Sequence, residues 1–456
     1  MTDLIDDSVP VDLRASFGGT FLSAADQAYE EARRVHNGLI DKRPTLIARC
    51  HTVADVIDAV HLARERRLEV SIRGGGHNVA GKAVTDGGLM IDLAPMKGVH
   101  VDPNARHVWA QGGVTWRDYN RAAGVHGLAT TGGLVSTTGI AGLTLGGGEG
   151  WLMGRYGMSV DNLRAAEIVT ADGQLLRASA DTNPDLFWGL RGGGGNFGIV
   201  TSFEYGAHSV KTVLGGIVAH PLDQAGHVIA RYREISATAP DELTTALGLV
   251  HDPAGSGAKL IATPFCHCGD NHARAEEDTR ALRLVSAGGA DMATRMPYPA
   301  INTILDDGFP RGTLNYWKSA LLRELTPEAL DVMIEAFQRC PSTMTSIVII
   351  HYHGAMSRVD PTETAFPHRG PGFSFVILTQ WTDPADTHAN IAWTQETFDA
   401  LRPHSVDKVY VNNLSADDSG QIRDAYGVNW ARLVGLKKKY DPTNFFHLNH
   451  NIDPSG

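Results

Sequence analysis

The sequence predicts an α+β protein built from two unlike parts, and three observations support this prediction. The chain has 456 residues, 43% of them hydrophobic, which is enough for two or three globular domains. Its 50 glycines are spread unevenly, because four dense clusters lie before residue 200. After about residue 209 the pattern changes to strands alternating with long amphipathic helices, which indicates an antiparallel sheet covered by helices.

The first part, residues 43–208, is expected to follow a helical lead-in at residues 1–42, whose second half is rich in Ala, Glu and Arg. Thr52 followed by Asp55 indicates the capped start of a helix. Apolar runs on either side of this helix indicate strands, and a glycine turn follows the second of them. The strands expected here lie at residues 45–49, 68–72, 89–93, 107–110, 166–170, 174–178 and 197–204.

The second part, residues 209–407, is expected to form a substrate-facing cap, and residues 408–456 a separate C-terminal segment with a helix and an irregular tail. Its expected strands lie at residues 243–250, 259–265, 346–352 and 373–380. Its expected helices lie at residues 222–236, 272–285, 327–338 and 387–401.

Composition excludes several classes of partner. The net charge of −11 argues against nucleic acid and anionic membranes. The N-terminus has no apolar signal segment, no run approaches the roughly 18 apolar residues of a membrane span, and four cysteines fit a reducing cytoplasm. Cys266-His267-Cys268 is too tightly spaced for a zinc site, so no metal is expected. We expect a cytoplasmic monomer or homodimer.

The stretch Arg73-Gly74-Gly75-Gly76-His77-Asn78 is the most informative motif. Glycines let a backbone approach a ligand closely, and the N–H groups of such loops bind phosphate anions. The motif therefore indicates a loop that holds a phosphate-bearing cofactor and presents an imidazole to its reactive ring. The other clusters lie at residues 111–113, 139–150 and 191–198.

Residues 193–198 formally match the dinucleotide fingerprint G-x-G-x-x-G. That fingerprint requires a strand before it and a helix after it, whereas here a β-branched strand follows. An NAD-dependent dehydrogenase is therefore the weaker interpretation. No lysine follows a glycine cluster as a P-loop requires.

Taken together, these motifs resemble the FAD-binding domain of the vanillyl-alcohol oxidase and p-cresol methylhydroxylase (PCMH) superfamily. More narrowly, the chain is similar to the berberine-bridge-enzyme-like flavoproteins along nearly its whole length. The resemblance implies a two-subdomain FAD-binding PCMH-type domain followed by a substrate domain. The motifs that carry it are residues 73–78, 86–88, 139–150, 156–157, 161–162, 183–200, 410–412, 439–446 and 449–452.

The resemblance implies FAD bound covalently through one histidine. His77 occupies the position that bonds the 8α-methyl of the flavin in this family. Val135 stands where many relatives carry a second, cysteinyl link, so no such link is expected. The residues expected to bind the cofactor are His77, Arg73, Gly74, Gly75, Gly76, Asn78, Gly81, Gly133, Thr138, Gly139, Gly142, Leu145, Gly146, Gly147, Gly148, Gly150, Asn162, Gly198, Ile199, Val200, Tyr410, Asn412, Asn449 and Asn451.

The catalytic base is less evident. Some relatives place a glutamate on the cap sheet, where this chain has Val348. A phenol would then have to act, first Tyr410 and second Tyr352, unless the substrate loses only hydride; a core tyrosine is an equal alternative for Tyr410. Thr138 is small enough to leave oxygen a path to the flavin, as in relatives that react with O2.

Other side chains could line the pocket, and His351 with His353 could bind metal, although such pairs more often pack under helices. The further lining candidates are Tyr316, Trp317, Lys318, Gln380 and Trp381.

The expected function is therefore an FAD-dependent oxidase. It would take two electrons from a small alcohol, amine or secondary metabolite and pass them to O2, giving H2O2. The alternatives are an FAD-dependent dehydrogenase with another acceptor and a flavin-binding protein without turnover.

Overall fold

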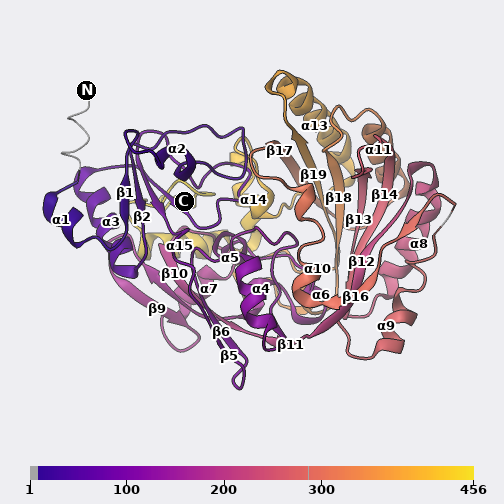
Figure 1. Ribbon diagram of the computed structural model, residues 1–456, viewed down its shortest axis with the longest axis horizontal. Helices are drawn as coiled ribbons and strands as arrows, with labels where there is room; N and C mark the ends of the chain where they lie inside the picture. The colour runs from indigo at the N-terminus through magenta and orange to yellow at the C-terminus, as the bar shows by residue number, and fades with distance from the viewer. Residues whose placement is uncertain (1–8, 286) are drawn as a thin grey trace.

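The computed structural model describes residues 9–285 and 287–456, and it has two lobes with a cavity between them (Figure 1). One lobe holds two small sheets and both termini, and the other is a single large sheet with helices on its outer face. Within the described residues no helix is both long and apolar enough to cross a membrane.

The first small sheet has the order β1-β2-β4-β3, with β2, β4 and β3 parallel. Helix α3 joins β2 to β3, and Thr52 and Asp55 form the expected capping box at its start. Because the strands are parallel, the glycine loop after β3 leaves the same sheet edge as the ends of its neighbours. The elements are β1 (Thr20–Leu22), β2 (Leu46–Arg49), α3 (Val53–Arg66), β3 (Val70–Arg73) and β4 (Leu89–Asp92).

The second small sheet is antiparallel, in the order β5-β6-β10-β8-β9. A hairpin at residues 171–173 joins β8 to β9, which correspond to the strands expected at residues 166–170 and 174–178. The strands are β5 (Val99–Asp102), β6 (His107–Gln111), β8 (Leu163–Val169), β9 (Leu175–Ser179) and β10 (Ile199–Gly206); β7 (Leu128–Ala129) pairs β11 (His208–Ser209) alongside. The helices are α4 (Trp116–Gly124), α5 (Ile140–Leu145), α6 (Met153–Tyr156) and α7 (Pro184–Leu190).

The large sheet has the order β15-β12-β14-β13-β18-β19-β17, and β16 also pairs with β12. Its strands are β12 (Thr212–Pro221), β13 (Leu243–His251), β14 (Lys259–His267), β15 (Ala290–Asp291), β16 (Thr294–Pro297), β17 (Leu314–Leu322), β18 (Ser346–Tyr352) and β19 (Gly372–Trp381). Its helices are α8 (Ala225–Thr238), α9 (His272–Thr279), α10 (Tyr298–Ile301), α11 (Pro327–Gln338), α12 (Ala355–Arg358) and α13 (Thr387–Leu401).

Alternation along these strands divides the side chains between two faces. Leu247, Ile349 and Phe375 pack under α8, α11 and α13. Their neighbours Gly248 and Val348 face the cavity instead. Strands β12 and β17 were not expected, because Gly215 and Gly216 interrupt the apolar pattern in β12 and polar residues interrupt it in β17.

The expected helical lead-in is wrong for the described residues. Within 9–42 the chain forms only two short helices, α1 (Val11–Ser16) and α2 (Tyr29–Ala32), besides β1; residues 1–8 lie outside the described part. The reason is tertiary: the backbone N–H of His36 donates to Gly76, and that of Gly38 donates to Thr313. A continuous helix would have used those N–H groups internally.

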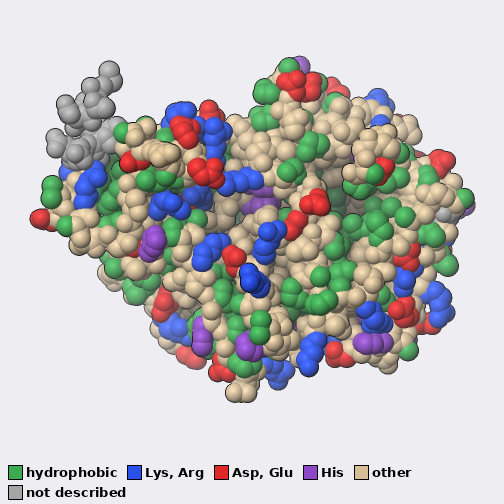
Figure 2. All heavy atoms as spheres, in the orientation of Figure 1, with side chains coloured by type: hydrophobic (Ala, Val, Ile, Leu, Met, Phe, Trp, Pro, Cys, Tyr) green, Lys and Arg blue, Asp and Glu red, His purple; other side chains and the backbone are tan. Residues whose placement is uncertain are grey.

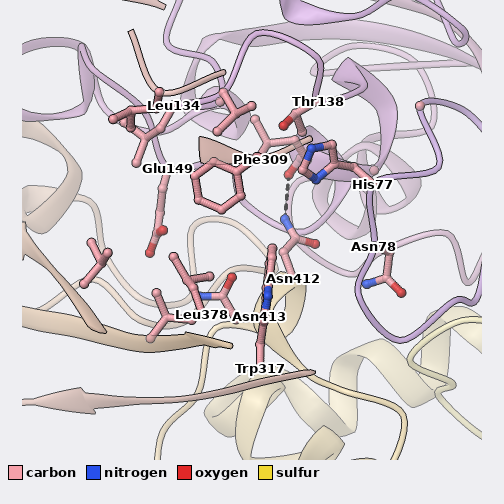
Figure 3. Close-up of a pocket in the computed structure, with 18 of the residues that line it drawn as sticks. His77, Asn78, Leu134, Thr138, Glu149, Phe309, Trp317, Leu378, Asn412 and Asn413 are labelled. Carbon is pink, nitrogen blue, oxygen red and sulfur yellow. Dashed lines mark hydrogen bonds between the residues drawn. The ribbon is translucent and has the colours of Figure 1, made fainter. Parts of the chain in front are cut away.

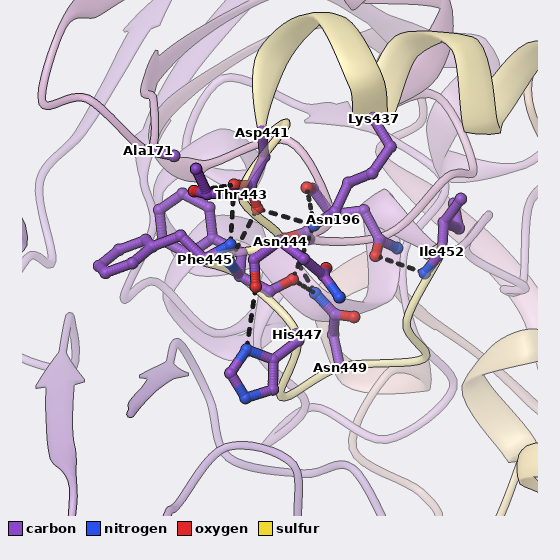
Figure 4. Close-up of polar contacts among 12 residues, drawn as sticks. Ala171, Asn196, Lys437, Asp441, Thr443, Asn444, Phe445, His447, Asn449 and Ile452 are labelled. Atoms are coloured by element: carbon purple, nitrogen blue, oxygen red, sulfur yellow. Dashed lines mark hydrogen bonds and ion pairs between the residues drawn. The ribbon is translucent and has the colours of Figure 1, made fainter. Parts of the chain in front are cut away.

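The C-terminal segment packs against the glycine-rich lobe and is fixed there by a buried cation (Figure 4). The expected helix is divided by Gly427, at φ 45°, into α14 (Ile422–Tyr426) and α15 (Trp430–Tyr440). The Lys437 ammonium donates to the Asp441 carboxylate and to the carbonyls of Asn196 and Phe446. The tail is thereby joined to the glycine cluster at residues 191–198.

Candidate functional site

A cavity of about 1200 Å³ lies between the glycine loops and the inner face of the large sheet. Figure 2 shows acidic and basic side chains mixed over the glycine-rich lobe and the boundary, with hydrophobic side chains gathered over the sheet lobe. Glycine loops from the first lobe form one wall, and strands β12, β13, β14, β18 and β19 form the other. The C-terminal tail closes one end through Leu448, Asn449 and His450.

The glycine wall depends on two loops that meet at their backbones. A side chain added at Gly75 would lie 2.5 Å from the Cα of Gly139, and the reverse contact is equally close. Neither position can therefore carry a Cβ, which explains why both loops are glycine-rich. Thr138 is carried into the cavity wall beside them.

His77 follows this contact and lines the cavity (Figure 3). Its ring stacks on His36, with centroids 3.9 Å apart and planes 18° apart. Burial lowers the pKa of His77 to about 3 and that of His36 to about 4. Both imidazoles are therefore neutral near pH 7, and the Nε2 atoms of both have no hydrogen-bond partner among the described residues. A neutral imidazole with a free nitrogen is the nucleophilic form.

The glycine wall fits a flavin dinucleotide. A Cβ at Gly142 or Gly195 would meet no atom within 4 Å, so both positions face open space. The buried Oδ1 atoms of Asn78 and Asn449 lack partners within the described chain and are available to a ligand. Lys82 is the only Lys or Arg among the described residues that line the cavity, so it is placed to meet a pyrophosphate. The sequence interpretation missed Lys82, and only its position five residues after His77 could have suggested it.

Most of the expected cofactor residues line the cavity. They are Gly74, Gly75, Gly76, His77, Asn78, Gly133, Thr138, Gly139, Gly142, Leu145, Gly146, Gly198, Ile199, Val200, Tyr410, Asn412 and Asn449, and Val135 lines it as well.

The prediction that Arg73 binds the cofactor is corrected, because its side chain turns away from the cavity. Its guanidinium donates to both carboxylate oxygens of Asp92, at 2.9 and 2.6 Å, and to the carbonyl of Arg34. It thus anchors the start of the glycine loop.

Six other expected residues also do not line the cavity. The Asn162 amide donates to the carbonyls of Tyr156 and Met158, which fixes a turn elsewhere in the lobe. Glycines at the remaining positions make room for the chain itself: a Cβ at Gly81 would strike Ile40, and one at Gly150 would lie 1.9 Å from the Gly132 carbonyl oxygen. The same holds for Gly147 and Gly148, while Asn451 lies just beyond the lining residue His450.

Glu149 is a second cavity residue that the sequence interpretation missed. It lies within the glycine cluster at residues 139–150, after Gly147 and Gly148, whose φ angles are 133° and 92°. This turn directs the Glu149 side chain into the cavity (Figure 3), where the residue is only 7% exposed. Burial raises the pKa of the carboxyl to about 7. A lone acidic residue inside a glycine run was the signal that could have identified it.

Of the two tyrosines proposed as bases, Tyr352 contacts the Glu149 side chain. Tyr352 does not line the cavity; its hydroxyl donates a hydrogen bond to the Glu149 carboxylate. Burial and the neighbouring Glu149 raise the pKa of Tyr352 well above its ordinary value. Burial likewise raises the pKa of Tyr410. A base must be able to lose its proton, so the raised pKa of each tyrosine argues against both assignments.

Tyr410 nevertheless faces the cavity. Its hydroxyl oxygen accepts hydrogen bonds from the Gly148 backbone N–H and the Asn412 amide, each at 2.8 Å. With both lone pairs used, the hydroxyl proton is the group that remains to bind a ligand.

Among the remaining candidates, Trp317 and Gln380 line the cavity. Tyr316 and Lys318 turn outward to Asp417, and Trp381 is buried away from the cavity. The stacked pair His351 and His353 lies outside the cavity lining, and no cluster of three or more metal-ligating side chains occurs among the described residues.

Comparison with known families assigns a class to this site. Residues 44–179 match a family described as an FAD binding domain, and residues 409–453 match one described as berberine and berberine like. The protein is an FAD-linked oxidoreductase.

Individual relatives define the family more closely. (R)-6-hydroxynicotine oxidase of Paenarthrobacter nicotinovorans is 29% identical over 97% of this chain and 98% of its own. Berberine bridge enzyme-like 6 of Arabidopsis thaliana is 28% identical over 95% of this chain and 85% of its own. The crystal structure of 6-hydroxy-D-nicotine oxidase from Arthrobacter nicotinovorans superimposes with a TM-score of 0.87, at 27% identity over 96% of this chain and 98% of its own. The chain is similar to the berberine-bridge-enzyme-like flavoproteins over nearly its whole length, and this similarity confirms the expected fold class and FAD cofactor.

Proposed function

We propose that this protein is an FAD-dependent oxidase that removes two electrons and two protons, as a hydride and a proton, from a carbon bearing a hydroxyl or amine and from that group, with O2 as the acceptor that becomes H2O2. The observation that carries the proposal is Glu149, a buried carboxyl with a pKa of about 7 in the cavity wall that also holds His77. A general base is most effective when its pKa lies near the working pH. FAD, when bound, supplies the two-electron acceptor.

His77 forms the covalent attachment in this proposal. Its neutral ring and free Nε2 are suited to bond the 8α carbon, and His36 holds the ring in place by stacking. Val135 has no thiol, so the attachment is single. Asn78, Asn449 and Lys82 hold the polar parts of the cofactor.

Glu149 accepts the proton that leaves the substrate. The Tyr352 hydroxyl stabilises the carboxylate by its hydrogen bond, and the Tyr410 hydroxyl binds the substrate oxygen or nitrogen. Figure 3 shows Glu149 and His77 on opposite sides of Phe309 in this view, so the base and the attachment point flank the centre of the cavity. Thr138, small and next to His77, leaves O2 its path.

The remaining expectations are part of the proposal. Four free cysteines and a net charge of −11 support a reducing cytoplasm and a small-molecule substrate rather than nucleic acid or membrane as partner. The protein is proposed to act as a monomer or homodimer. The name of the relative (R)-6-hydroxynicotine oxidase supports oxidase activity.

The test is a panel of alcohols and amines offered to the purified yellow protein. We expect anaerobic bleaching of the flavin by at least one compound, and stoichiometric peroxide when air is admitted. Bleaching without peroxide, but with reduction of an added dye, would favour a dehydrogenase. Absence of bleaching across the panel would favour a flavin-binding protein without turnover.

A further inference from the structure

The substrate side of the cavity is a continuous row of small apolar residues across five strands. Val376 on β19 pairs with Val348 on β18, which pairs with Gly248 on β13. Gly248 pairs in turn with Ala262 on β14, and Ala262 pairs with Ala219 on β12. All five line the cavity. Since they are in register, they form one straight floor rather than separate pockets.

This floor is long. Neighbouring strands lie about 4.8 Å apart, so four spacings between β19 and β12 span roughly 19 Å. The side chains along it are no larger than valine, and towards β12 they are Gly and Ala, so the floor is also flat. A single six-membered ring would cover less than half of it.

The rows beside this floor are apolar as well. One holds Ile350, Ala246, Pro264 and Ile217, and the other holds Leu378, Ser346, Val250 and Leu260, with Ser346 the only polar member. The facing wall contributes Ile304, Leu305, Phe309, Met292 and Met344.

Two polar side chains at the margin, Gln380 and His251, are already engaged. The Gln380 amide donates to the Gly308 carbonyl, and the His251 ring contacts the Thr345 carbonyl oxygen at 3.4 Å. A sugar placed here would lose water from its hydroxyls without replacement, at a cost for each unpaired group. A flat apolar ring system would gain free energy from every ring that it buries.

We propose that the substrate is an extended, fused-ring compound that carries one hydroxyl or amine at its reacting end. This inference rests on the proposed function, because that function places the reacting end beside Glu149. The rings then extend across the floor towards Ala262 and Ala219. Sugars and single-ring compounds are excluded as the main substrates.

The test is a series that shares one reacting group and differs in ring number: benzyl alcohol, 2-naphthalenemethanol and 2-anthracenemethanol, with glucose for comparison. Binding to the holoenzyme is followed by perturbation of the flavin absorbance and by the intrinsic tryptophan fluorescence, with neither readout requiring turnover. We expect the Kd to fall by about tenfold for each added ring, and glucose to bind more weakly than any of them. Equal affinity for one and three rings, or glucose binding as tightly as naphthalenemethanol, would overturn the proposal.

The variant Ala262→Leu locates the rings. It should weaken the binding of 2-anthracenemethanol by at least tenfold while leaving the Kd of benzyl alcohol unchanged, because only the longer compound reaches β14. Ala258→Leu makes the same change at an exposed residue just before β14 and should leave both unchanged. Equal weakening of the long and short probes by Ala262→Leu would contradict the placement. If that variant fails to fold, the wild-type ring series alone still decides the substrate class.

Failure of this inference is distinguishable from failure of the proposed function. Tight ring binding without flavin reduction would remove the oxidase function and keep the ligand class. Flavin reduction by sugars, with no preference for rings, would remove the ligand class and keep the oxidase function.

Discussion

The two walls of the cavity recognise their ligands by different means. The glycine wall uses backbone approach, as where Gly75 touches Gly139, and a few polar atoms left without partners, such as those of Asn78 and Asn449. The sheet wall uses regular strands with small apolar side chains, as at Gly248 and Ala262. In the proposed function, the cofactor is therefore held by features that sequence motifs record, whereas the substrate is held by a surface that arises only when distant strands pair.

The largest effect expected is on the glycine wall. His77→Ala removes the imidazole proposed to form the covalent bond, so we expect flavin to be released completely on denaturation. In-gel flavin fluorescence of the denatured wild type and variant measures this. His447→Ala, at an outer histidine that bonds Glu69 away from the cavity, is the matched control and should keep its flavin. Flavin that washes out of the denatured wild type, or a flavin peptide attached at another residue, would contradict the single His77 link.

The same difference between the walls explains what the sequence could predict. The capped helix α3, the hairpin between β8 and β9 and the glycine loops follow from local residue chemistry, and the structure shows each of them. Strands β12 and β17 were not predicted, because glycine and polar residues interrupt their alternation of apolar and polar side chains. Their formation depends on pairing with β14 and β19.

The direction of side chains was the second feature that the sequence could not predict. Arg73 sits inside the cofactor motif, yet its guanidinium turns back to Asp92, a residue 19 positions away. Tyr352 lies two residues after the cavity-lining Ile350 on β18, yet it does not line the cavity itself and its hydroxyl ends at Glu149, 203 positions away. A residue's strand face follows from sequence spacing, whereas its hydrogen-bond partner does not.

Glu149 breaks the simple division between the walls, because it belongs to the glycine wall and is proposed to act on the substrate. Glu149→Gln keeps the shape and removes the base, so flavin reduction should slow by about 10²–10⁴-fold. The base form exists above the carboxyl's pKa, so the wild-type rate should rise with pH through about 7. That rise should be absent in the variant, whose flavin attachment should be intact.

The control for this prediction is Asp307→Asn, which neutralises an exposed carboxyl elsewhere on the cavity lining. Stopped-flow reduction of both variants by the same substrate makes the comparison. Equal slowing by both, or no slowing by Glu149→Gln, would remove Glu149 as the base.

Thr138 tests whether O2 reaches the flavin along the glycine wall. Thr138→Leu adds bulk next to His77, so reoxidation of the reduced enzyme by air should slow severalfold. Thr138→Ser, which adds no bulk, should reoxidise at the wild-type rate. Double-mixing stopped-flow traces measure reoxidation separately from reduction. Unchanged reoxidation in the leucine variant would place the oxygen path elsewhere.

The smallest effect expected tests a bond that joins the two walls, from Tyr352 on the sheet to Glu149 on the glycine turn. This hydrogen bond lowers the Glu149 pKa against the larger upward effect of burial. Its loss in Tyr352→Phe should therefore raise that pKa by about one unit, as expected for a net hydrogen-bond contribution of about 1 kcal/mol. The rising limb of the rate profile should move to higher pH by the same amount, so the variant is slower at pH 7 and equal to wild type at pH 9. Tyr232→Phe, which removes a buried hydroxyl bonded to Thr245 in the outer core, should leave the profile in place. A variant profile that coincides with the wild type, or one lowered equally at every pH, would mean that Tyr352 does not set the ionisation of the base.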